Sequence, residues 1–438
     1  MKRSSLSWAF VIVGILALSL ATLGAKQGQH DLYGHYRQLA NVVDEIKDKY
    51  VEDVDVDKLF EGAIKGMLAT LPDPYNGYFT GAMLEQFHVD TEGKFGGLGI
   101  EITISDRVLT VLTPIVGTPA FRAGVEAGDK IIKIDGESTE NLSLTDAVTK
   151  LRGPAGAEVT ITVLREGEPQ PIDIPITRAV IVVPSLRGVR MIDERAKIGY
   201  IWLTNFQRAT ATELEQAVDE LMTKGMGSLV LDLRHNPGGL LPMAIAVSDL
   251  FLEEGVIVKT KGRKEDEEQE FHAKPNKNHK LAVIPIVLLV NSTSASASEI
   301  VAGALRDHKR AIVVGTRTFG KGSVQTVITM EQGKAALKLT TARYYTPSDK
   351  PILRDKGIEP DIVVELTREQ QKRLNDFLRQ EHIRENQNGE LKEVAPKAPD
   401  GKEQPKLTWE TVDLQLVRAV DMLRFGKIFY ERLVAGGK

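Results

Sequence analysis

The chain has 438 residues, enough for roughly two to four domains of about 100–200 residues each. Its hydrophobic fraction of 42% is ordinary for a folded protein, and a formal net charge of −4 argues against a nucleic-acid binder that depends on a basic surface. The absence of cysteine excludes a disulfide framework, a thiol nucleophile, thiolate metal sites and a lipid-modified cysteine anchor.

The N-terminus has the layout of an export signal, because Lys2 and Arg3 precede an apolar run from Trp8 to about Ala25. The run is somewhat long for a cleaved signal and somewhat short for a membrane span, which takes about 20 residues. Residues 1–25 are therefore expected to be either a signal peptide or a membrane anchor. A buried helix of a soluble protein is disfavoured, since the segment is apolar on all faces.

The next stretches predict a helical region and then a β-rich domain. Apolar residues from Tyr33 to Tyr50 recur at helical spacing, and a second helix is expected from Val56 to Thr70. From Phe95 onward the apolar period becomes two, as in a half-buried strand. Glycine-rich turns, further short strands and one helix, Leu144–Leu151, complete this expected domain.

The third block alternates apolar strands with helices, which predicts an α/β layer with a largely covered sheet. Strands are expected at Ile198–Leu203, Ser228–Leu233, Ile284–Val290, Ala311–Gly315 and Ala336–Ala342, and helices at Thr212–Lys224, Pro242–Leu252 and Ala297–Arg306. The charge run Arg263–Glu270 is expected to be a solvated loop or hairpin tip. A linker is expected near Glu385–Lys406 and a closing helix at Trp409–Val434.

A serine-rich segment, Asn291–Ile300, follows a buried strand and begins a helix. A strand-to-helix turn can expose a serine hydroxyl at the end of a sheet. The free N–H groups of the helix start would stabilise both an alkoxide and an oxyanion. Taken alone, however, Ser296-x-x-Glu299 before an apolar run is a capping box, and that structural interpretation is the stronger one for this motif by itself.

A second motif places Lys321 between Gly320 and Gly322, directly after an apolar strand. A solvated lysine has a pKa of about 10.4 and is a poor base at neutral pH, but desolvation lowers that pKa, and a neutral amine can take a serine proton. A phosphate-binding loop is a rival interpretation, since Gly315 to Lys321 matches its first part. Gly322 stands where that motif needs Ser or Thr, and an isolated lysine of this kind is otherwise a surface residue.

Three separate stretches of the chain resemble motifs of one known family, and they occur in the order that this family shows. Ser294–Leu305 with Asp307, followed by Thr318–Gln325, looks like the active-site signature of the C-terminal processing (tail-specific) peptidases, which are S41-type serine proteases. Leu231–Gly239 resembles the oxyanion loop of that family, and Phe95–Ile102 looks like the start of its PDZ domain. The resemblance covers roughly residues 35–365.

By this resemblance Ser296 is the nucleophile, Lys321 is the general base and Gln325 orients the lysine. Residues i and i+4 of a strand lie about 13 Å apart, so a contact between Lys321 and Gln325 predicts a short helical turn after Gly320. Asp307 matches a position once counted with the catalytic set in some members, although ending the helix or bracing a loop is the favoured role.

The resemblance also implies an oxyanion hole and a peptide-binding loop. The oxyanion hole would use the amide of Ala297 with that of Gly238 or Gly239. Arg152 lies where some members couple the PDZ domain to the active site. The carboxylate-binding loop, whose successive N–H groups form an anion nest and whose following strand can pair with a peptide, corresponds to Gly97, Leu98, Gly99 and Ile100.

The resemblance therefore predicts a multidomain α/β protein with a catalytic core of the ClpP/crotonase type. The expected parts are residues 1–25 (signal or anchor), 30–83 (helical), 84–176 (PDZ), 177–367 (peptidase core) and 368–438 (linker and helical tail). Two departures stand out: Asp73-Pro74-Tyr75-Asn76 replaces the usual Asp-Pro-His-Ser, and the tail after about residue 384 lies outside the shared pattern.

The predicted function is that of an exported, periplasmic serine endopeptidase, held at the inner membrane if its N-terminal segment is not cleaved. It would cleave proteins or peptides recognised by their C-terminal tails, through an acyl-enzyme and without cofactor or metal. No nucleic-acid partner is expected. Related tails can serve self-assembly or adaptor docking, so a homo-oligomer and an adaptor protein are the further partners suggested. The alternatives are a non-proteolytic PDZ scaffold and an acyl hydrolase on the same fold.

Overall fold

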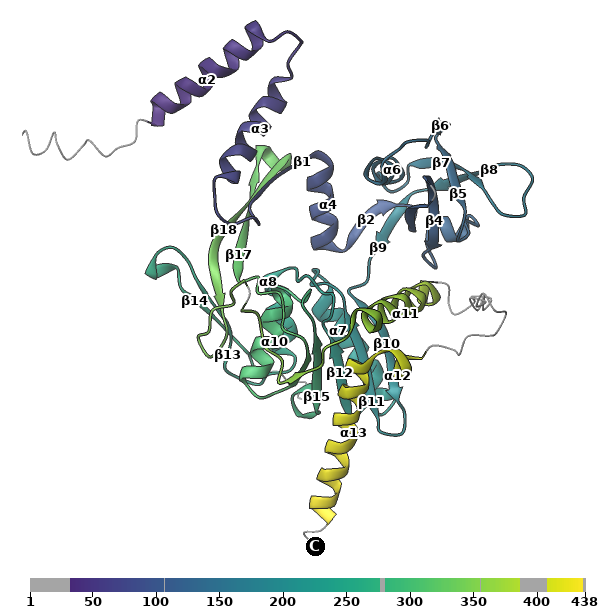
Figure 1. Ribbon diagram of the computed structural model, residues 1–438, viewed down its shortest axis with the longest axis vertical. Helices are drawn as coiled ribbons and strands as arrows, with labels where there is room; N and C mark the ends of the chain where they lie inside the picture. The colour runs from purple at the N-terminus through teal and green to yellow at the C-terminus, as the bar shows by residue number, and fades with distance from the viewer. Residues whose placement is uncertain (1–31, 106, 276–279, 355, 387–407, 436–438) are drawn as a thin grey trace, which may run out of the picture. The chain divides into compact units, whose positions relative to one another are not determined.

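The computed structural model describes residues 32–105, 107–275, 280–354, 356–386 and 408–435 (Figure 1). The apolar run at 8–25 and most of the predicted linker lie outside these residues. The chain divides into two compact units, Met1–Tyr78 and Phe79–Lys438. The first contains the predicted helices, α2 (Leu32–Lys49) and α3 (Val56–Ala69), and neither helix has a buried residue. The short strand β1 (Gly77–Thr80) spans the division.

The second unit begins with α4 (Gly81–Glu92) and then forms the β-rich domain. Strand β2 (Lys94–Gly97) pairs with β9 (Ala179–Val182), so the chain enters and leaves this domain through neighbouring strands. Its sheet has the order β3-β4-β5-β7-β8, with β6 paired to β5. The elements are β3 (Ile100–Ser105), β4 (Val108–Pro114), α5 (Pro119–Arg122), β5 (Lys130–Ile134), β6 (Glu137–Ser138), α6 (Leu144–Leu151), β7 (Glu158–Leu164) and β8 (Ile172–Thr177).

The α/β layer is a six-stranded sheet with the order β10-β11-β12-β15-β16-β19. All neighbours are parallel except β10, which pairs antiparallel with β11 at the edge. The strands are β10 (Leu186–Asp193), β11 (Ile198–Leu203), β12 (Ser228–Asp232), β15 (Ile286–Val290), β16 (Ile312–Gly315) and β19 (Ile362–Val363). The predicted strands of this sheet are therefore confirmed, with small shifts at their ends.

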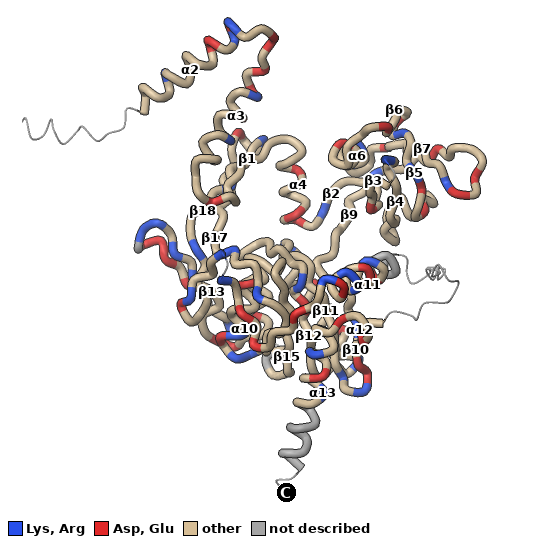
Figure 2. The backbone as a smooth tube through the Cα atoms, in the orientation of Figure 1, with Lys and Arg blue, Asp and Glu red and all other residues tan. Residues whose placement is uncertain are grey.

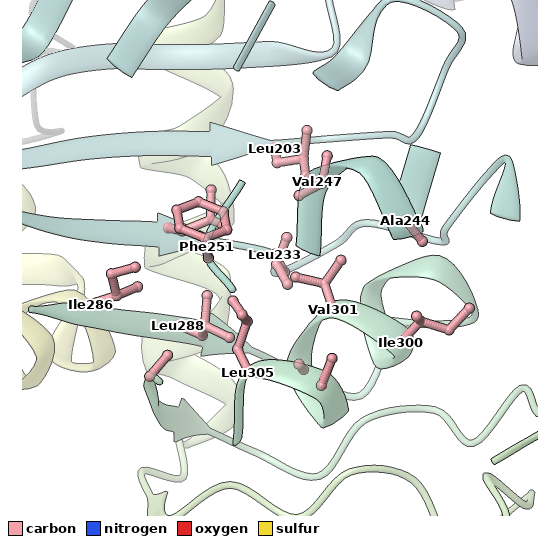
Figure 3. Packing of buried hydrophobic residues seen from close by; sticks show 14 of the residues in the cluster. Leu203, Leu233, Ala244, Val247, Phe251, Ile286, Leu288, Ile300, Val301 and Leu305 are labelled. Atoms are coloured by element: carbon pink, nitrogen blue, oxygen red, sulfur yellow. The ribbon is translucent and has the colours of Figure 1, made fainter. Parts of the chain in front are cut away.

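Both faces of this sheet are covered, as its nearly all-apolar strands predict. On one face the strands pack against α7 (Thr210–Thr223), α8 (Leu241–Asp249) and α10 (Ala297–Asp307). Figure 3 shows Leu288 of β15, Val247 of α8 and Leu305 of α10 in this cluster. On the other face, alternate residues of the same strands pack against α13 (Leu414–Ala435). The C-terminal helix is thus part of the core of this layer.

The same part of the chain also forms a second sheet. Strand β18 (Ala335–Tyr345) pairs with β13 (Val256–Lys261) and with β17 (Ser323–Met330), and β13 pairs with β14 (Gln269–His272). The predicted charge run lies at the tip of the β13–β14 hairpin, where the backbone tube of Figure 2 is coloured for both basic and acidic residues. The tip contains the short helix η1 (Glu265–Glu267); η2 (Glu331–Gly333) joins β17 to β18, and α9 (Lys280–Val283) precedes β15.

Two features of the C-terminal region differ from the sequence expectation. Residues Arg368–Asn386 form a helix, α11, where none was predicted. The closing helix is divided at Asp413 into α12 (Trp409–Val412) and α13. Among the described residues, no helix is long and apolar enough to cross a membrane.

Candidate active site

Ser296 is the residue before α10, at the turn that follows strand β15. Its φ of 56° and ψ of −111° are unusual for a residue with a side chain. Ser296 is 7% exposed and lines a cleft of about 890 Å³. The capping-box interpretation is correct for the carboxylate, because Glu299 Oε2 accepts the Ser296 N–H at 2.8 Å. Ser296 is therefore both the residue that caps α10 and a residue that lines the cleft.

The neighbouring serines have structural contacts instead. The Ser294 hydroxyl donates to the Leu233 carbonyl oxygen at 2.8 Å, and the Ser298 hydroxyl donates to that of Asn236 at 3.0 Å. Both side chains are fully buried and neither lines the cleft. Their bonds attach the turn to the loop that follows β12. Of these three serines, only Ser296 is placed to meet a substrate.

The glycines around Lys321 are required by a close approach of two backbone segments. A Cβ at Gly322 would lie 1.6 Å from the Ile352 carbonyl oxygen, and one at Gly320 would lie 2.1 Å from that of Leu353. Gly320 also has a φ of 87°, which glycine adopts without strain. Lys321 itself is half-buried and lines the same cleft as Ser296. The Gly-Lys-Gly sequence thus directs one lysine into the cleft from a tightly packed loop.

Gln325 also lines the cleft, but the predicted helical turn after Gly320 is wrong. Residues Ser323–Met330 form strand β17, and a shift in register with β18 falls between Val324 and Gln325. Such an irregularity turns side chains away from the regular alternation of a strand. The Gln325 side-chain amide donates to the Ser323 carbonyl oxygen at 3.0 Å and to its hydroxyl at 2.8 Å.

The glycine amides predicted for an oxyanion hole lie in the loop after β12, which approaches Ser296. A Cβ at Gly238, whose φ is 105°, would lie 2.8 Å from the Ser296 Cβ, so this glycine permits the loop to contact the serine. Gly238 N–H donates to Asn236 Oδ1 at 2.9 Å. Among the described residues, the amides of Ala297 and Gly239 have no protein acceptor. These two donors are therefore available to a ligand, and Gly238 would first have to leave Asn236.

The rest of the cleft wall combines polar backbone with apolar side chains. Its apolar part comes from α8 and from strands β14, β17 and β18, and includes Leu241, Phe271, Val324 and Tyr344. Burial raises the pKa of the Tyr344 hydroxyl, so this side chain stays neutral. Among the described residues, no group of acidic, histidine or cysteine side chains could hold a metal ion.

Comparisons with known proteins show the family of this chain. The model of peptidase family S41 matches residues 197–364, which contain five of the six strands of the sheet and the cleft residues Ser296, Lys321 and Gln325. A carboxy-terminal-processing protease of Bartonella bacilliformis is 43% identical over 366 residues, which are 81% of this chain and 82% of that protein. The chain belongs to peptidase family S41. It is thus a serine protease of the carboxy-terminal processing type.

Other matches extend over the remaining parts of this S41 protease. The carboxy-terminal processing protease CtpA of Bacillus subtilis is 37% identical over 375 residues, which are 84% of this chain and 78% of that one. Models of the PDZ domain and of the activating protease CtpB N-terminal domain match residues 110–165 and 19–81. Among solved structures, the photosystem II D1 C-terminal processing protease is 30% identical, covering 75% of this chain and 92% of that chain at a TM-score of 0.41.

Asp307 is placed away from the cleft of the S41 protease. It ends α10, and its carboxylate accepts from the Ser348 N–H at 3.0 Å and from the Ser348 hydroxyl at 2.7 Å. Burial opposes ionisation of Asp307, but these bonds outweigh it and hold its pKa below the ordinary value. Asp307 does not line the cleft. The structure therefore supports the loop-bracing role that the sequence favoured.

The loop predicted to bind a carboxylate lines a groove of the PDZ-like domain. Gly97, Leu98, Gly99 and Ile100 line a groove of about 80 Å³, together with α6 and Arg152. Gly99 has a φ of 79°, and its carbonyl oxygen accepts from the Thr118 hydroxyl at 3.0 Å. The Arg152 guanidinium lies 4.6 Å from the centre of the Phe95 ring and donates to Gln86 of α4 at 2.7 Å. Arg152 thus joins the groove to the segment that precedes β2.

One important residue was given only a capping role by the sequence. Glu299 is fully buried, and its carboxylate also accepts from the Thr318 hydroxyl and from the backbone of the lysine loop. The capping-box spacing shows why a glutamate is present, but it does not reveal the contact with residues 318–321. Only the folded chain brings the two motifs together.

Proposed function

We propose that this protein is an endopeptidase that cleaves polypeptides recognised by their C-terminal tails, with Ser296 as nucleophile and Lys321 as general base. The observation that carries this proposal is the shared cleft. Ser296 and Lys321, from segments far apart in the sequence, line it together with Gln325, Gly238 and Gly239. A non-proteolytic scaffold is not favoured, because family membership and an intact set of these residues both support catalysis.

The proposed reaction follows the chemistry of a serine with an amine base. The Ser296 hydroxyl attacks the scissile carbonyl carbon and gives its proton to the neutral Lys321 amine. The amides of Ala297 and Gly239 stabilise the oxyanion. As the tetrahedral intermediate collapses, the C–N bond breaks and the leaving amine takes the proton from Lys321. Water, deprotonated by Lys321, then hydrolyses the ester at Ser296.

The PDZ-like groove is proposed to select the substrate. The loop Gly97–Ile100 would receive the terminal carboxylate on its N–H groups, and β3 would pair with the extended tail. Reading the tail at this groove and cutting at the cleft would bring substrates with free, accessible C-termini to Ser296. We also propose that the protein forms a homo-oligomer and that an adaptor protein takes part in substrate recognition.

Export to the periplasm is proposed from Lys2, Arg3 and the apolar run that follows them. Fusion of residues 1–30 to a reporter that is active only outside the cytoplasm tests the export. N-terminal sequencing of the mature protein distinguishes a cleaved signal from a retained anchor. An inactive fusion would refute export.

A cleavage assay on a peptide with an apolar C-terminus tests the enzymatic proposal. Ser296→Ala should abolish cleavage without loss of folding, whereas Ser294→Ala and Ser298→Ala, which lose only structural hydrogen bonds, should remain active. Amidation of the peptide C-terminus should slow cleavage by the intact protein. An active Ser296→Ala protein would show that another residue is the nucleophile. Equal cleavage of the amidated peptide would remove the carboxylate-reading role.

A further inference from the structure

Glu299 joins the two halves of the proposed catalytic pair. Its side chain is 0% exposed, and it lies in the first turn of α10. One carboxylate oxygen, Oε2, accepts both the Ser296 N–H and the Lys321 N–H, each at 2.8 Å. The other oxygen, Oε1, accepts the Thr318 hydroxyl at 2.5 Å and the Gly320 N–H at 2.6 Å. A single buried oxygen atom therefore holds the backbones of Ser296 and Lys321 next to each other.

All four partners of this carboxylate are donors in the structure. An ionised carboxylate only accepts, so it satisfies four donors, whereas a protonated one would present a donor to them. Burial raises the pKa of Glu299, and the four hydrogen bonds partly oppose that rise. The free N–H groups at the start of α10 also favour a negative charge there. The site is thus built around an ionised but poorly solvated carboxylate.

The lysine loop depends on this carboxylate for its position. On its other side the loop is pressed against residues 352–354, which require the absence of a Cβ at Gly320 and Gly322. The Ile358 N–H donates to the Thr318 hydroxyl oxygen at 2.7 Å, which extends the same hydrogen-bond chain. The loop is therefore fixed between the C-terminal segment of the core and Glu299.

We propose that Glu299 is a positioning residue that sets the separation of Ser296 and Lys321, and that catalysis needs its carboxylate ionised. This inference rests on the proposed roles of Ser296 and Lys321. Glu299 acts through the two backbones and takes no part in bond making. A displacement of about 1 Å between reacting groups can cost roughly 100-fold in rate, so loss of this link should reduce turnover much more than substrate binding.

The test is Glu299→Gln, measured as kcat and KM on one peptide with a free C-terminus. Glutamine offers one oxygen and one amino group, so at least two of the four donors lose their acceptor. We expect kcat to fall about 100-fold while KM stays within about twofold. The matched control is Glu213→Gln, because Glu213 also lies in the first turn of a helix, α7, and accepts a backbone N–H, from Ser185, at 2.8 Å. This control should keep the wild-type kcat.

A second variant separates positioning from folding. Thr318→Val keeps the side-chain volume but removes the hydroxyl that donates to Glu299 Oε1. Thr318→Val should lower kcat with little change in KM. If Glu299→Gln does not fold, this variant tests the positioning role of Glu299. A wild-type kcat in Glu299→Gln, or in Thr318→Val where Glu299→Gln does not fold, would overturn the inference, provided that Ser296→Ala is inactive. An active Ser296→Ala protein would instead overturn the proposed function on which the inference rests.

Discussion

The backbone at Ser296, the proposed nucleophile, is strained. With φ at 56° and ψ at −111°, this residue occupies a region that a side chain disfavours, by about 1–3 kcal/mol. The strain is maintained by the buried contacts of Ser294, Ser298 and Glu299 on either side. The hydroxyl is thereby directed to the cleft at the expense of local stability.

This strain predicts an order of stability for two inactive variants. Ser296→Gly and Ser296→Ala both lose the hydroxyl, but only glycine adopts the positive φ freely. Glycine gains from the relief of strain and loses some of that gain to the entropy of the unfolded chain, so Ser296→Gly should be more stable by about 1 kcal/mol. Denaturant unfolding of the two proteins measures the difference. Equal stabilities would show that the turn relaxes in solution.

If Lys321 is the general base, a positive charge at this position is not sufficient for catalysis. Lys321→Arg should be nearly inactive, because arginine stays protonated and cannot accept the proton of Ser296. Lys224→Arg is the control, since Lys224 is an exposed lysine paired with Glu220 on α7. The measurement is kcat/KM for both variants on one peptide. Near wild-type activity in Lys321→Arg would make Lys321 an electrostatic residue and not the base.

Among the elements, those with a regular apolar period were predicted well and those defined by distant contacts were not. The strands of the six-stranded sheet are short apolar runs bounded by turn residues. This pattern is typical of strands in a sheet that is covered on both faces. Helix α11 was missed because its sequence is strongly polar, with buried Leu374 and Phe377 among many charged residues. The bulge at Gln325 was missed because a register shift depends on the partner strand β18.

The candidate site also has features that the sequence predicts and features that depend on distant contacts. Ser296 and Lys321 could be singled out because the two short motifs that contain them, each ambiguous alone, together resemble the signature of a known family. The four-donor contact of Glu299 could not be predicted, because its partners at 318–321 are about 20 residues away in the sequence and meet it only in the folded chain. The contact of Gly238 with Ser296 could not be predicted either, because it depends on a residue far away in the sequence, although the φ of 105° at Gly238 also favours glycine by itself.

An ion pair between two elements predicts a pH dependence of stability. Asp193, at the end of β10, accepts the Ala196 N–H at 2.8 Å and pairs with Arg424 of α13 at 2.7 Å. The backbone hydrogen bond first, and then Arg424, lower the pKa of Asp193 against the effect of burial. A lowered pKa adds stability above the pKa of the unfolded chain, and this stability is lost as pH falls through the folded value.

Asp193→Asn should therefore be less stable than the wild type by about 1 kcal/mol near neutral pH. The difference should shrink as pH falls below about 4, because the wild-type carboxylate then takes up a proton as well. Urea unfolding of both proteins at several pH values measures it. A difference that does not change with pH would show that the aspartate contributes through packing and not through its charge.

At the scale of the whole molecule, a buried ionic cluster attaches the C-terminal segment to the catalytic core. Arg234, at 2% exposure, donates to both oxygens of Asp413, at 2.8 and 2.7 Å, and also to Asp232. Arg234 directly precedes the loop that ends at Gly239. The Asp413 carboxylate also accepts the Leu416 N–H at 3.0 Å, so it caps α13 as well. The start of α13 thereby stabilises the end of β12, which leads to the loop proposed to form the oxyanion hole.

Asp413→Ala should therefore lower the free energy of unfolding by about 3 kcal/mol, because a buried guanidinium loses a bidentate partner and α13 loses its cap. Asp421→Ala is the control on the same helix. Its pair with Arg424 is well exposed, at 42% and 40%, so its cost should stay within about 0.5 kcal/mol. Denaturant unfolding gives both values, and hydrogen exchange shows whether α13 opens first in Asp413→Ala. Equal costs for the two substitutions would mean that α13 is held by its apolar contacts with the sheet alone, and that the Arg234 cluster is independent of the tail.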